Sequence, residues 1–324
     1  MAQDLKLFAL QASRRLGEEV AAAIGVPLAA HEEREFEDGE HKARPLESVR
    51  GSDVYVVQCL HGMAAGEVDA RLVRTLFFIA AIKDAGAARV TAVIPYLCYA
   101  RKDRRTKSRD PVTTRYVAQL FEAVGTDRVC VLDVHNLAAY QNAFRIPAEH
   151  LEARRLLAAA TKERIGAEPL VVVSPDSGGV KRADAFRETL AALVKAEIPL
   201  AFAEKHRSAG VVRGHTLVGE VSGRTAILVD DLISTGTTLV RAAARCRELG
   251  ARAVHAVATH GILAGGAPAL FATADLSSVT LTDSVPIAQN LRREQRLYVI
   301  PVAPFLGEAI RRLHEGASLV ELNG

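Results

Sequence analysis

The chain carries seven short runs of apolar residues, many of them β-branched, separated by longer mixed segments. Few of these runs alternate strictly between apolar and polar residues, which is typical of parallel strands covered on both faces. We therefore predict buried strands at residues 53–59, 89–95, 128–133, 169–174, 225–230, 253–259 and 297–302.

Between the predicted strands, apolar residues recur at helical spacing, and glycines close the patterns. Asp110 and Pro111 together indicate a helix start, because aspartate caps free N–H groups and proline fits the first helical position. We expect three buried stripes, Val68-Leu72-Leu76-Ile79, Tyr116-Val117-Leu120-Phe121-Val124 and Leu239-Ala243-Cys246-Leu249, which end at Gly86, Gly125 and Gly250.

The alternation of strands and helices predicts an α/β fold with mainly parallel sheets flanked by helices. The strand–helix–strand order of the first half recurs in the second half, which indicates a duplication of one α/β domain. We expect domains at residues 1–150 and 151–324, joined near residues 148–166. We also allow for the extreme C-terminus to pack back on the first domain.

Composition narrows the class of protein. The 324 residues suit two domains, and a hydrophobic content of 49% excludes a mainly disordered chain. A net charge of only +3 and the lack of tryptophan argue against a nucleic-acid partner. The four cysteines form no CxxC pair, so we expect buried thiols. The longest apolar run, residues 76–82, is far below the ~20 residues of a membrane span, and the start lacks a signal-peptide pattern, so we expect a cytoplasmic protein.

The strongest chemical signal is the segment 227–239, ILVDDLISTGTTL. An apolar strand runs into two acids, and a loop rich in hydroxyls and glycine then leads into a helix. Such a loop binds phosphate well, because the free N–H groups and the dipole of the helix N-terminus face it, while the acids suit sugar hydroxyls. The candidate sugar-phosphate residues are Asp230, Asp231, Ser234, Thr235, Gly236, Thr237 and Thr238.

Two further loops follow predicted strands. In SPDSGGVKR (174–182), Gly178 and Gly179 could cradle an anion, and Asp176 could hold a divalent cation beside it. In DVHN (133–136), Asp133 and His135 stand at a strand end and are candidate metal ligands. A single histidine at a strand end is more often structural, but the nearby carboxylate and phosphate-type loop favour a role in binding.

Three charged segments complete the candidate chemistry. In EKHR (204–207), Lys205 and Arg207 would project from the same side of an extended segment, as a flap over a phosphate chain; an ordinary solvated loop is the alternative. In YARKDRR (99–105), Arg101 and Lys102 follow a strand end, where they could meet a polyphosphate.

The third segment, FEDGEH (36–41), sets an aromatic residue among acids and a turn glycine. This composition suits Phe36 stacked on a base, with Asp38 and Glu40 as hydrogen-bonding groups around Gly39.

The segment 227–239 resembles the phosphoribosyl-phosphate loop of the type I phosphoribosyltransferase fold, which leaves transferases and the synthetase of phosphoribosyl diphosphate both open. All the segments together, in order from FEDGE to the C-terminal AIRRLHEGASL, resemble the ribose-phosphate pyrophosphokinase family across residues 7–319. The resemblance implies two tandem phosphoribosyltransferase-like domains, with ATP-binding elements in the first and the ribose-5-phosphate site in the second.

The resemblance also implies roles for individual residues. The adenine-binding loop would be Phe36, Asp38, Gly39 and Glu40, donated by a neighbouring subunit, and the other ATP-binding residues would be Arg101 and Lys102. Magnesium would be bound by Asp133, His135 and Asp176; the catalytic pair would be Lys205 and Arg207; ribose 5-phosphate would be bound by Asp230, Asp231 and residues 234–238. The family further implies a homo-oligomer of dimers, up to a hexamer.

Some positions depart from the family pattern. Lys102 stands where glutamine is usual, Ser234 replaces an aspartate of the ribose-phosphate loop, and Thr237 replaces a glycine. The segment 59–67 also departs from the commoner bacterial sequence around the allosteric region, so the resemblance supports no expectation about regulation.

The activity implied by the resemblance is transfer of a diphosphoryl group from MgATP to the C1 hydroxyl of ribose 5-phosphate. No GxxxxGK[ST] motif is present, so ATP would not bind through a P-loop. Two alternatives stay open: a phosphoribosyltransferase that consumes phosphoribosyl diphosphate, and an inactive, synthetase-like regulatory subunit.

Overall fold

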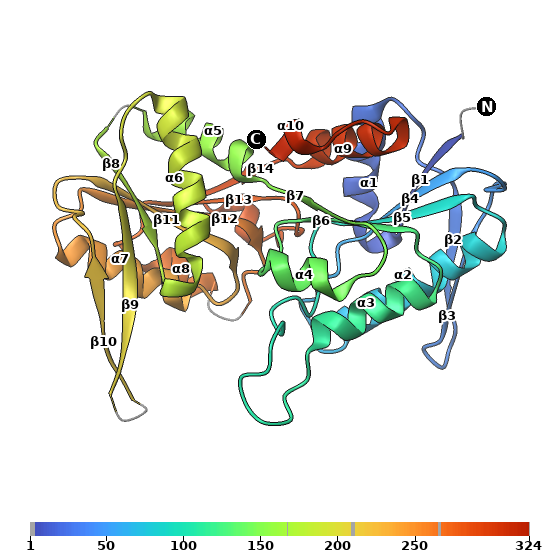
Figure 1. The fold of residues 1–324 in the computed structure, drawn as a ribbon, viewed down its shortest axis with the longest axis horizontal. Helices are drawn as coiled ribbons and strands as arrows, with labels where there is room; N and C mark the ends of the chain where they lie inside the picture. Colours follow the sequence, from blue (N-terminus) through green and yellow to red (C-terminus); the bar gives the residue numbers. More distant parts are fainter. Residues whose placement is uncertain (1–3, 167, 209–210, 265–266, 324) are drawn as a thin grey trace. The chain divides into compact units, whose positions relative to one another are not determined.

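The computed structural model describes residues 4–166, 168–208, 211–264 and 267–323, with side chains described outside 204–215 and 265–269. Contacts between Cα atoms divide the chain into two units. The first unit consists of two segments, the residues up to Glu152 and those from Val302 onward. The second unit is Ala153–Pro301. Figure 1 shows the strands and helices of both units.

The first unit contains a five-stranded sheet in the order β1-β4-β5-β6-β7, in which every neighbouring pair is parallel. Its strands are β1 (Leu5–Ala9), β4 (Asp53–Val57), β5 (Arg89–Ile94), β6 (Arg128–Leu132) and β7 (Ala148–Leu151); β2 (His31–Glu35) and β3 (His41–Pro45) form a separate hairpin. Its helices are η1 (Gln11–Ser13), α1 (Arg14–Ile24), α2 (Glu67–Asp84), α3 (Thr113–Ala123), α4 (Leu137–Ala143), α9 (Ala303–Glu315) and α10 (Val320–Asn323).

The second unit contains a seven-stranded sheet in the order β10-β9-β8-β11-β12-β13-β14, in which only β10 is antiparallel to its neighbour. Its strands are β8 (Leu170–Ser174), β9 (Leu200–Ser208), β10 (Val211–Val218), β11 (Thr225–Ile233), β12 (Ala253–Gly261), β13 (Ser278–Thr282) and β14 (Leu297–Ile300). Its helices are α5 (Arg154–Ile165), η2 (Ser177–Gly179), α6 (Val180–Val194), α7 (Thr237–Glu248), α8 (Ala267–Ala272) and η3 (Leu291–Arg293).

The observed architecture confirms the predicted α/β fold and all seven predicted strands. The mainly parallel pairing explains why those strands lack alternation, because helices cover both faces of such a sheet. The strands that the apolar pattern did not predict are β1, β2, β3, β7, β9, β10 and β13. Among the predicted ones, β14 is not buried: it is an edge strand, and Tyr298 is 40% exposed.

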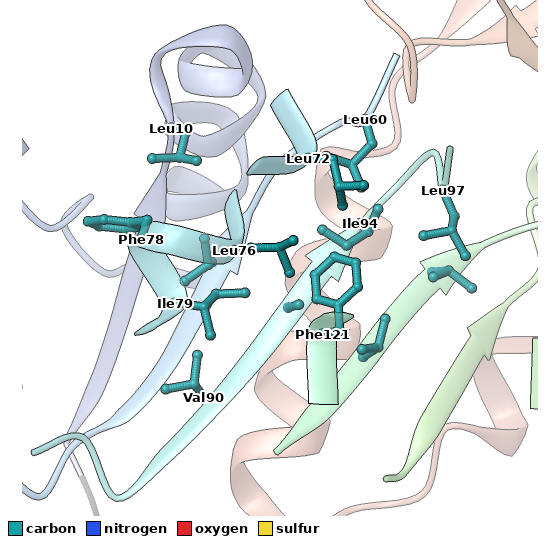
Figure 2. Close-up of a cluster of buried hydrophobic side chains, with 14 of the residues drawn as sticks. Leu10, Leu60, Leu72, Leu76, Phe78, Ile79, Val90, Ile94, Leu97 and Phe121 are labelled. Atoms are coloured by element: carbon teal, nitrogen blue, oxygen red, sulfur yellow. The ribbon is translucent and has the colours of Figure 1, made fainter. Parts of the chain in front are cut away.

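The core of the first unit forms where α2 and α3 pack on the sheet (Figure 2). Ile79 of α2, Phe121 of α3 and Ile94 of β5 are completely buried there. The stripe predicted on α2 is confirmed, since Leu72, Leu76 and Ile79 are buried. The four cysteines are likewise buried as free thiols, as expected for small apolar residues.

The predicted start of the helix after residue 109 is wrong. Helix α3 begins at Thr113, and Asp110 instead accepts hydrogen bonds within its own loop, from the backbone N–H groups of Thr106 (3.1 Å) and Lys107 (2.9 Å). The stripe on this helix is also narrower than expected, because Tyr116 and Leu120 are exposed. Asp110 was misassigned because the same carboxylate can cap a turn or a helix.

The C-terminal helix α9 packs on α1 of the first unit. Gly307 makes the close approach possible, since a Cβ there would lie 2.9 Å from Ile24 Cγ2. His314 Nδ1 lies 2.7 Å from Oδ2 of the buried Asp53, which also pairs with Arg89. The contacts thus group residues from Val302 with the first unit, while the domain limits expected from the sequence, 1–150 and 151–324, stay predictions.

Within the described ranges, no helix is long and apolar enough to cross a bilayer.

The core of the first unit can be tested on two adjacent residues of α3. Phe121→Ala should destabilise the unit by about 3–5 kcal/mol, because it empties a fully buried ring site. Leu120→Ala, on the exposed side of the same helix, should have little effect. Thermal unfolding followed by circular dichroism measures both variants, and equal losses of stability would contradict the packing described.

Candidate functional site

Three parallel strands of the second unit, β9, β8 and β11, end at the same edge of the sheet. Ser174 of β8 is in register with Phe202 of β9, and Val173 with Leu228 of β11. The segments that follow these positions carry Asp176, Lys205 and Asp230, so their backbones emerge at one edge. The carboxyl edge of a parallel sheet is where α/β proteins bind ligands.

The two acids of β11 lie within the strand rather than after it, because β11 continues to Ile233. Arg182, in the first turn of α6, lies beside both of them. Its Nη1 is 3.2 Å from Asp231 Oδ1 and 3.6 Å from Asp230 Oδ1. Asp231 is only 3% exposed, whereas the side chain of Asp230 keeps 26% of its surface. Asp230 is therefore the more accessible carboxylate for a ligand.

Asp230 holds its proton more tightly than an ordinary carboxyl group. Burial is the largest cause that raises its pKa, and the neighbouring Asp231 carboxylate adds to it through a hydrogen bond and repulsion. The positive charge of Arg182 opposes both effects. A group that donates hydrogen bonds, or a cation, would relieve this repulsion on binding, since it favours the charged form of the carboxylate.

The loop from Ser234 to Gly236 joins β11 to α7 and leaves the hydroxyls of Thr235 and Thr237 exposed, 3.1 Å apart. Gly236 is the N-cap residue of α7 and has a φ of +74°. A Cβ at Gly236 would lie 2.9 Å from Leu270 Cδ1, so both conformation and space favour glycine. The loop leads into the N-terminus of a helix of 12 residues, the arrangement expected of a phosphate site.

The loop after β8 is organised by Asp176. Its Oδ1 accepts hydrogen bonds from the N–H groups of Gly178 (2.9 Å) and Gly179 (3.1 Å). From the sequence, these two amides were expected to bind an anion. In the structure they donate instead to the aspartate of their own loop. The chain then enters α6 and brings Arg182 to the acids of β11.

Lys205 and Arg207 both lie on β9, in the antiparallel hairpin that β9 and β10 form (Figure 1). The backbone is extended at both residues, with Lys205 paired to His215 and Arg207 to Val212; that their side chains project from the same side stays a prediction. The side chains of both cations lie outside the described residues.

In the first unit, the loops after β5 and β6 are joined by a hydrogen bond in which Asn136 Nδ2 donates to Asp103 Oδ2 (2.6 Å). The first loop carries Arg101, which is exposed, and Lys102, whose Nζ lies 2.6 Å from Asp110 Oδ2. Lys102 is thus part of the loop framework. Its ammonium group and the hydrogen bonds from Thr106 and Lys107 hold the pKa of Asp110 well below the usual range.

The second loop carries Asp133 and His135. His135 is exposed, and Asp133 lies near His150, with 4.0 Å between Asp133 Oδ1 and His150 Nε2. The same Nε2 accepts the N–H of Val134 at 3.3 Å, which ties the loop to β7. No local pattern in the sequence indicates this role of His150.

The FEDGE segment forms the turn of the β2–β3 hairpin. The N–H of Phe36 donates to Glu40 O (2.8 Å), Asp38 Oδ1 accepts the N–H of Glu40 (3.0 Å), and Gly39 has a φ of +88°. The Phe36 ring is 37% exposed, with the Arg34 guanidinium 5.1 Å from its centroid. An exposed aromatic ring at a hairpin tip is available to stack on a flat ligand.

Asp133 and Asp176 supply carboxylate oxygens, which suit a hard cation such as Mg²⁺, whereas His135 supplies a nitrogen. Asp133 and His135 belong to the first unit and Asp176 to the second. Within the part of the chain that the structure describes, no three His, Cys, Asp or Glu side chains form a cluster that could hold a metal ion.

The sequence missed one central residue of the site, Arg182. Arg182 is the last residue of SPDSGGVKR. Its place in the first turn of a helix, two residues after Val180, is the one feature that could have pointed to a role in the site. The contact with β11 depends on the adjacency of β8 and β11 in the sheet, which local patterns do not contain.

The fold and the carboxyl-edge loops define an α/β enzyme of the phosphoribosyltransferase-like type. Residues 5–125 match the family model described as the N-terminal domain of ribose phosphate pyrophosphokinase, and residues 206–323 match the phosphoribosyl synthetase-associated domain. A ribose-phosphate pyrophosphokinase of Caldanaerobacter subterraneus subsp. tengcongensis is 40% identical over 320 residues, or 98% of each chain. One of Listeria ivanovii is 38% identical over 98% of this chain and 96% of its own.

The crystal structure of phosphoribosylpyrophosphate synthetase from Mycobacterium smegmatis covers 97% of this chain and 100% of its own, with a TM-score of 0.89 and 36% identity. The chain belongs to the ribose-phosphate pyrophosphokinase family. The resemblance seen in the sequence is thereby confirmed.

The raised pKa of Asp230 predicts a pH-dependent gain of stability for Asp230→Asn. In the unfolded chain a carboxyl group ionises near ~3.9, so the parent loses stability as the pH rises from there through the raised folded pKa. The variant lacks this loss, and its advantage in unfolding midpoint should grow from pH 4 to pH 9. Asp184→Asn, at a 44% exposed side chain in the same unit, is the control and should show no such trend. A constant difference across this range would contradict the environment described for Asp230.

Alanine in a left-handed backbone conformation costs about 1–2 kcal/mol. Gly236→Ala should destabilise the second unit by more than this, because the added Cβ would also collide with Leu270. Gly223→Ala is a matched control, since Gly223 has a φ of +67° and open space around its Cβ. Denaturant titration of both variants compares the two effects. The close contact is wrong if Gly223→Ala proves as costly.

Proposed function

We propose that this chain transfers the β,γ-diphosphoryl group of MgATP to the C1 hydroxyl of ribose 5-phosphate and releases AMP. The observation that carries the proposal is the similarity to relatives named ribose-phosphate pyrophosphokinase over 98% of the chain. A phosphoribosyltransferase would explain the β11 loop equally well. It would not explain the first unit with its FEDGE hairpin and the loop carrying Arg101.

Ribose 5-phosphate would bind at the carboxyl end of β11. Its phosphate would lie against the N–H groups and hydroxyls of Ser234, Thr235, Gly236, Thr237 and Thr238, where the α7 dipole favours an anion. Asp230 would accept hydrogen bonds from the sugar hydroxyls. Asp231 would act mainly by holding Arg182 in place, because it is buried against that guanidinium.

ATP would bind with its base against the exposed ring of Phe36, next to Asp38, Gly39 and Glu40, and with its phosphates near Arg101. The family implies that this hairpin serves the site of a neighbouring subunit, which makes the enzyme a homo-oligomer of dimers, up to a hexamer. Lys102 would act by shaping its loop through Asp110. These assignments, like the cytoplasmic location, stay predictions.

The chemical step is in-line attack of the C1 oxygen on the β-phosphorus, which depends on positioning and on neutralising charge. Lys205 and Arg207 would stabilise charge on the transferred group. Asp133 and His135 in the first unit, and Asp176 in the second, stay predicted ligands of Mg²⁺, a cation that when bound would neutralise charge on the phosphate oxygens. Asp230 would fix the sugar so that C1 faces the phosphate chain.

The direct test is to incubate the purified protein with MgATP and ribose 5-phosphate and to separate the nucleotides by chromatography. AMP should appear in equal amount to phosphoribosyl diphosphate. Formation of ADP, or no AMP at any magnesium or phosphate concentration, would contradict the proposal. Release of diphosphate from phosphoribosyl diphosphate and a free base would favour the phosphoribosyltransferase instead.

Lys205→Ala should lower kcat by about 10²–10³-fold or more while ATP still binds, because the lost cation acts on charge that develops during transfer. Lys162→Ala, at an exposed position of α5, is the control and should leave kcat unchanged. Steady-state rates together with equilibrium binding of ATP measure both effects. A change of only a few-fold in Lys205→Ala would rule out a catalytic role for this residue.

A further inference from the structure

Tyr99 lies in the loop after β5, two residues before Arg101, to which the proposed function gives a role in ATP binding. Its backbone has a φ of +58°, in the left-handed region. Bulky residues rarely adopt this conformation, whereas glycine adopts it without steric cost. A tyrosine at this position therefore indicates that its side chain has a task that offsets the strain.

The side chain of Tyr99 is tied to helix α2. Its hydroxyl donates a hydrogen bond to Oδ1 of Asp69, in the first turn of that helix. This bond is the largest cause that raises the pKa of Tyr99 to about 12, so the phenol stays a hydrogen-bond donor at neutral pH. The residue is 39% exposed, so the contact lies at the surface and not in the core.

The main chain around Tyr99 is tied to helix α3. The backbone N–H of Lys102 donates to Tyr99 O (3.3 Å), which closes a turn over residues 99–102. Thr114, a buried residue of α3, bonds both ends of this turn: its hydroxyl donates to Tyr99 O (3.0 Å) and its N–H to Lys102 O (3.4 Å). The turn is therefore fixed at both ends, and Arg101, inside it, is exposed.

These anchors determine the direction in which the turn presents Arg101. Loss of the contact with Asp69 would release Tyr99 from the left-handed region, and a change in that backbone angle reorients the residues that follow it in the turn. Guanidinium–phosphate pairs depend on direction as well as on distance. A reoriented Arg101 would therefore bind a polyphosphate less well.

We propose that Tyr99 is a positioning residue for the phosphate chain of ATP, because its hydrogen bond to Asp69 holds the turn that presents Arg101. The inference rests on the proposed function, from which it takes the role of Arg101. It adds Tyr99 and Asp69 as residues that act on ATP through this arginine rather than by contact.

The test measures equilibrium binding of MgATP to the full chain by calorimetric titration, without ribose 5-phosphate, so that no transfer takes place. Tyr99→Phe should weaken binding about three- to tenfold, the range of one hydrogen bond. The matched control Tyr116→Phe removes a hydroxyl from an exposed tyrosine of α3 and should leave binding unchanged. Unchanged binding in Tyr99→Phe, or equal weakening in Tyr116→Phe, would overturn the proposal.

Thermal unfolding separates positioning from a purely structural role. The unfolding midpoint of Tyr99→Phe should stay close to that of the parent, because a hydrogen bond to an exposed charge contributes little to stability. Weaker ATP binding together with a large drop in this midpoint would assign Tyr99 to folding and would contradict the positioning role.

Two further comparisons isolate the hydrogen bond and the residue through which it acts. Asp69→Asn keeps an acceptor oxygen and should bind ATP as the parent does, whereas Asp69→Ala should match Tyr99→Phe. In an Arg101→Ala background, Tyr99→Phe should cause no further loss, because its effect passes through that arginine. Weak binding in Asp69→Asn, or a full additional loss in the double variant, would refute the proposal.

The outcomes distinguish this inference from the proposed function. If the parent forms AMP and Arg101→Ala weakens ATP binding while Tyr99→Phe does not, only the positioning role fails. If the parent binds no ATP, or if Arg101→Ala binds it as the parent does, the positioning role fails together with the assignment of Arg101. If ATP binds but no AMP forms with ribose 5-phosphate, the proposed function fails, and the binding data alone decide on Tyr99.

Discussion

The site in the second unit depends on one electrostatic constraint: two adjacent carboxylates, Asp230 and Asp231, lie on a strand where little water reaches them. Burial raises the pKa of Asp230 most, and the neighbouring Asp231 carboxylate adds to the effect. The positive charge of Arg182 offsets the repulsion between the two carboxylates, because its guanidinium lies within 3.6 Å of both acids. The ion pairs with Arg182 therefore position both acids at this edge of the sheet.

The same constraint explains why three separate segments are needed. Arg182 reaches β11 only because β8 and β11 are neighbours, and the Asp176 loop fixes the start of the helix that carries it. Strand β9 lies on the other side of β8 and extends the backbone of Lys205 past the same edge. Parallel pairing thus collects residues that are far apart in the sequence, which the local chemistry of any one loop could not achieve.

The sequence predicted what depends on local patterns. Buried parallel strands such as β4 and β11 stand out as apolar runs, and the glycine at position 236 follows from its place at a helix start. It failed where one residue type serves two purposes: Asp110 caps a turn and not α3, and Tyr116 is exposed although its spacing fits the helix stripe. Arg182, His150 and the return of α9 to the first unit depend on tertiary contacts, which a single sequence does not reveal.

The central claim is that the carboxyl end of β11 holds the sugar phosphate. Hydrogen-exchange mass spectrometry with and without ribose 5-phosphate tests it most directly, in the presence of Mg²⁺ and a non-hydrolysable ATP analogue in both samples. Backbone amides of residues 230–240 should exchange more slowly with the sugar phosphate, while those of the edge strand β14 in the same unit should not change. Protection of β14 or of other segments, with none at residues 230–240, would contradict the claim.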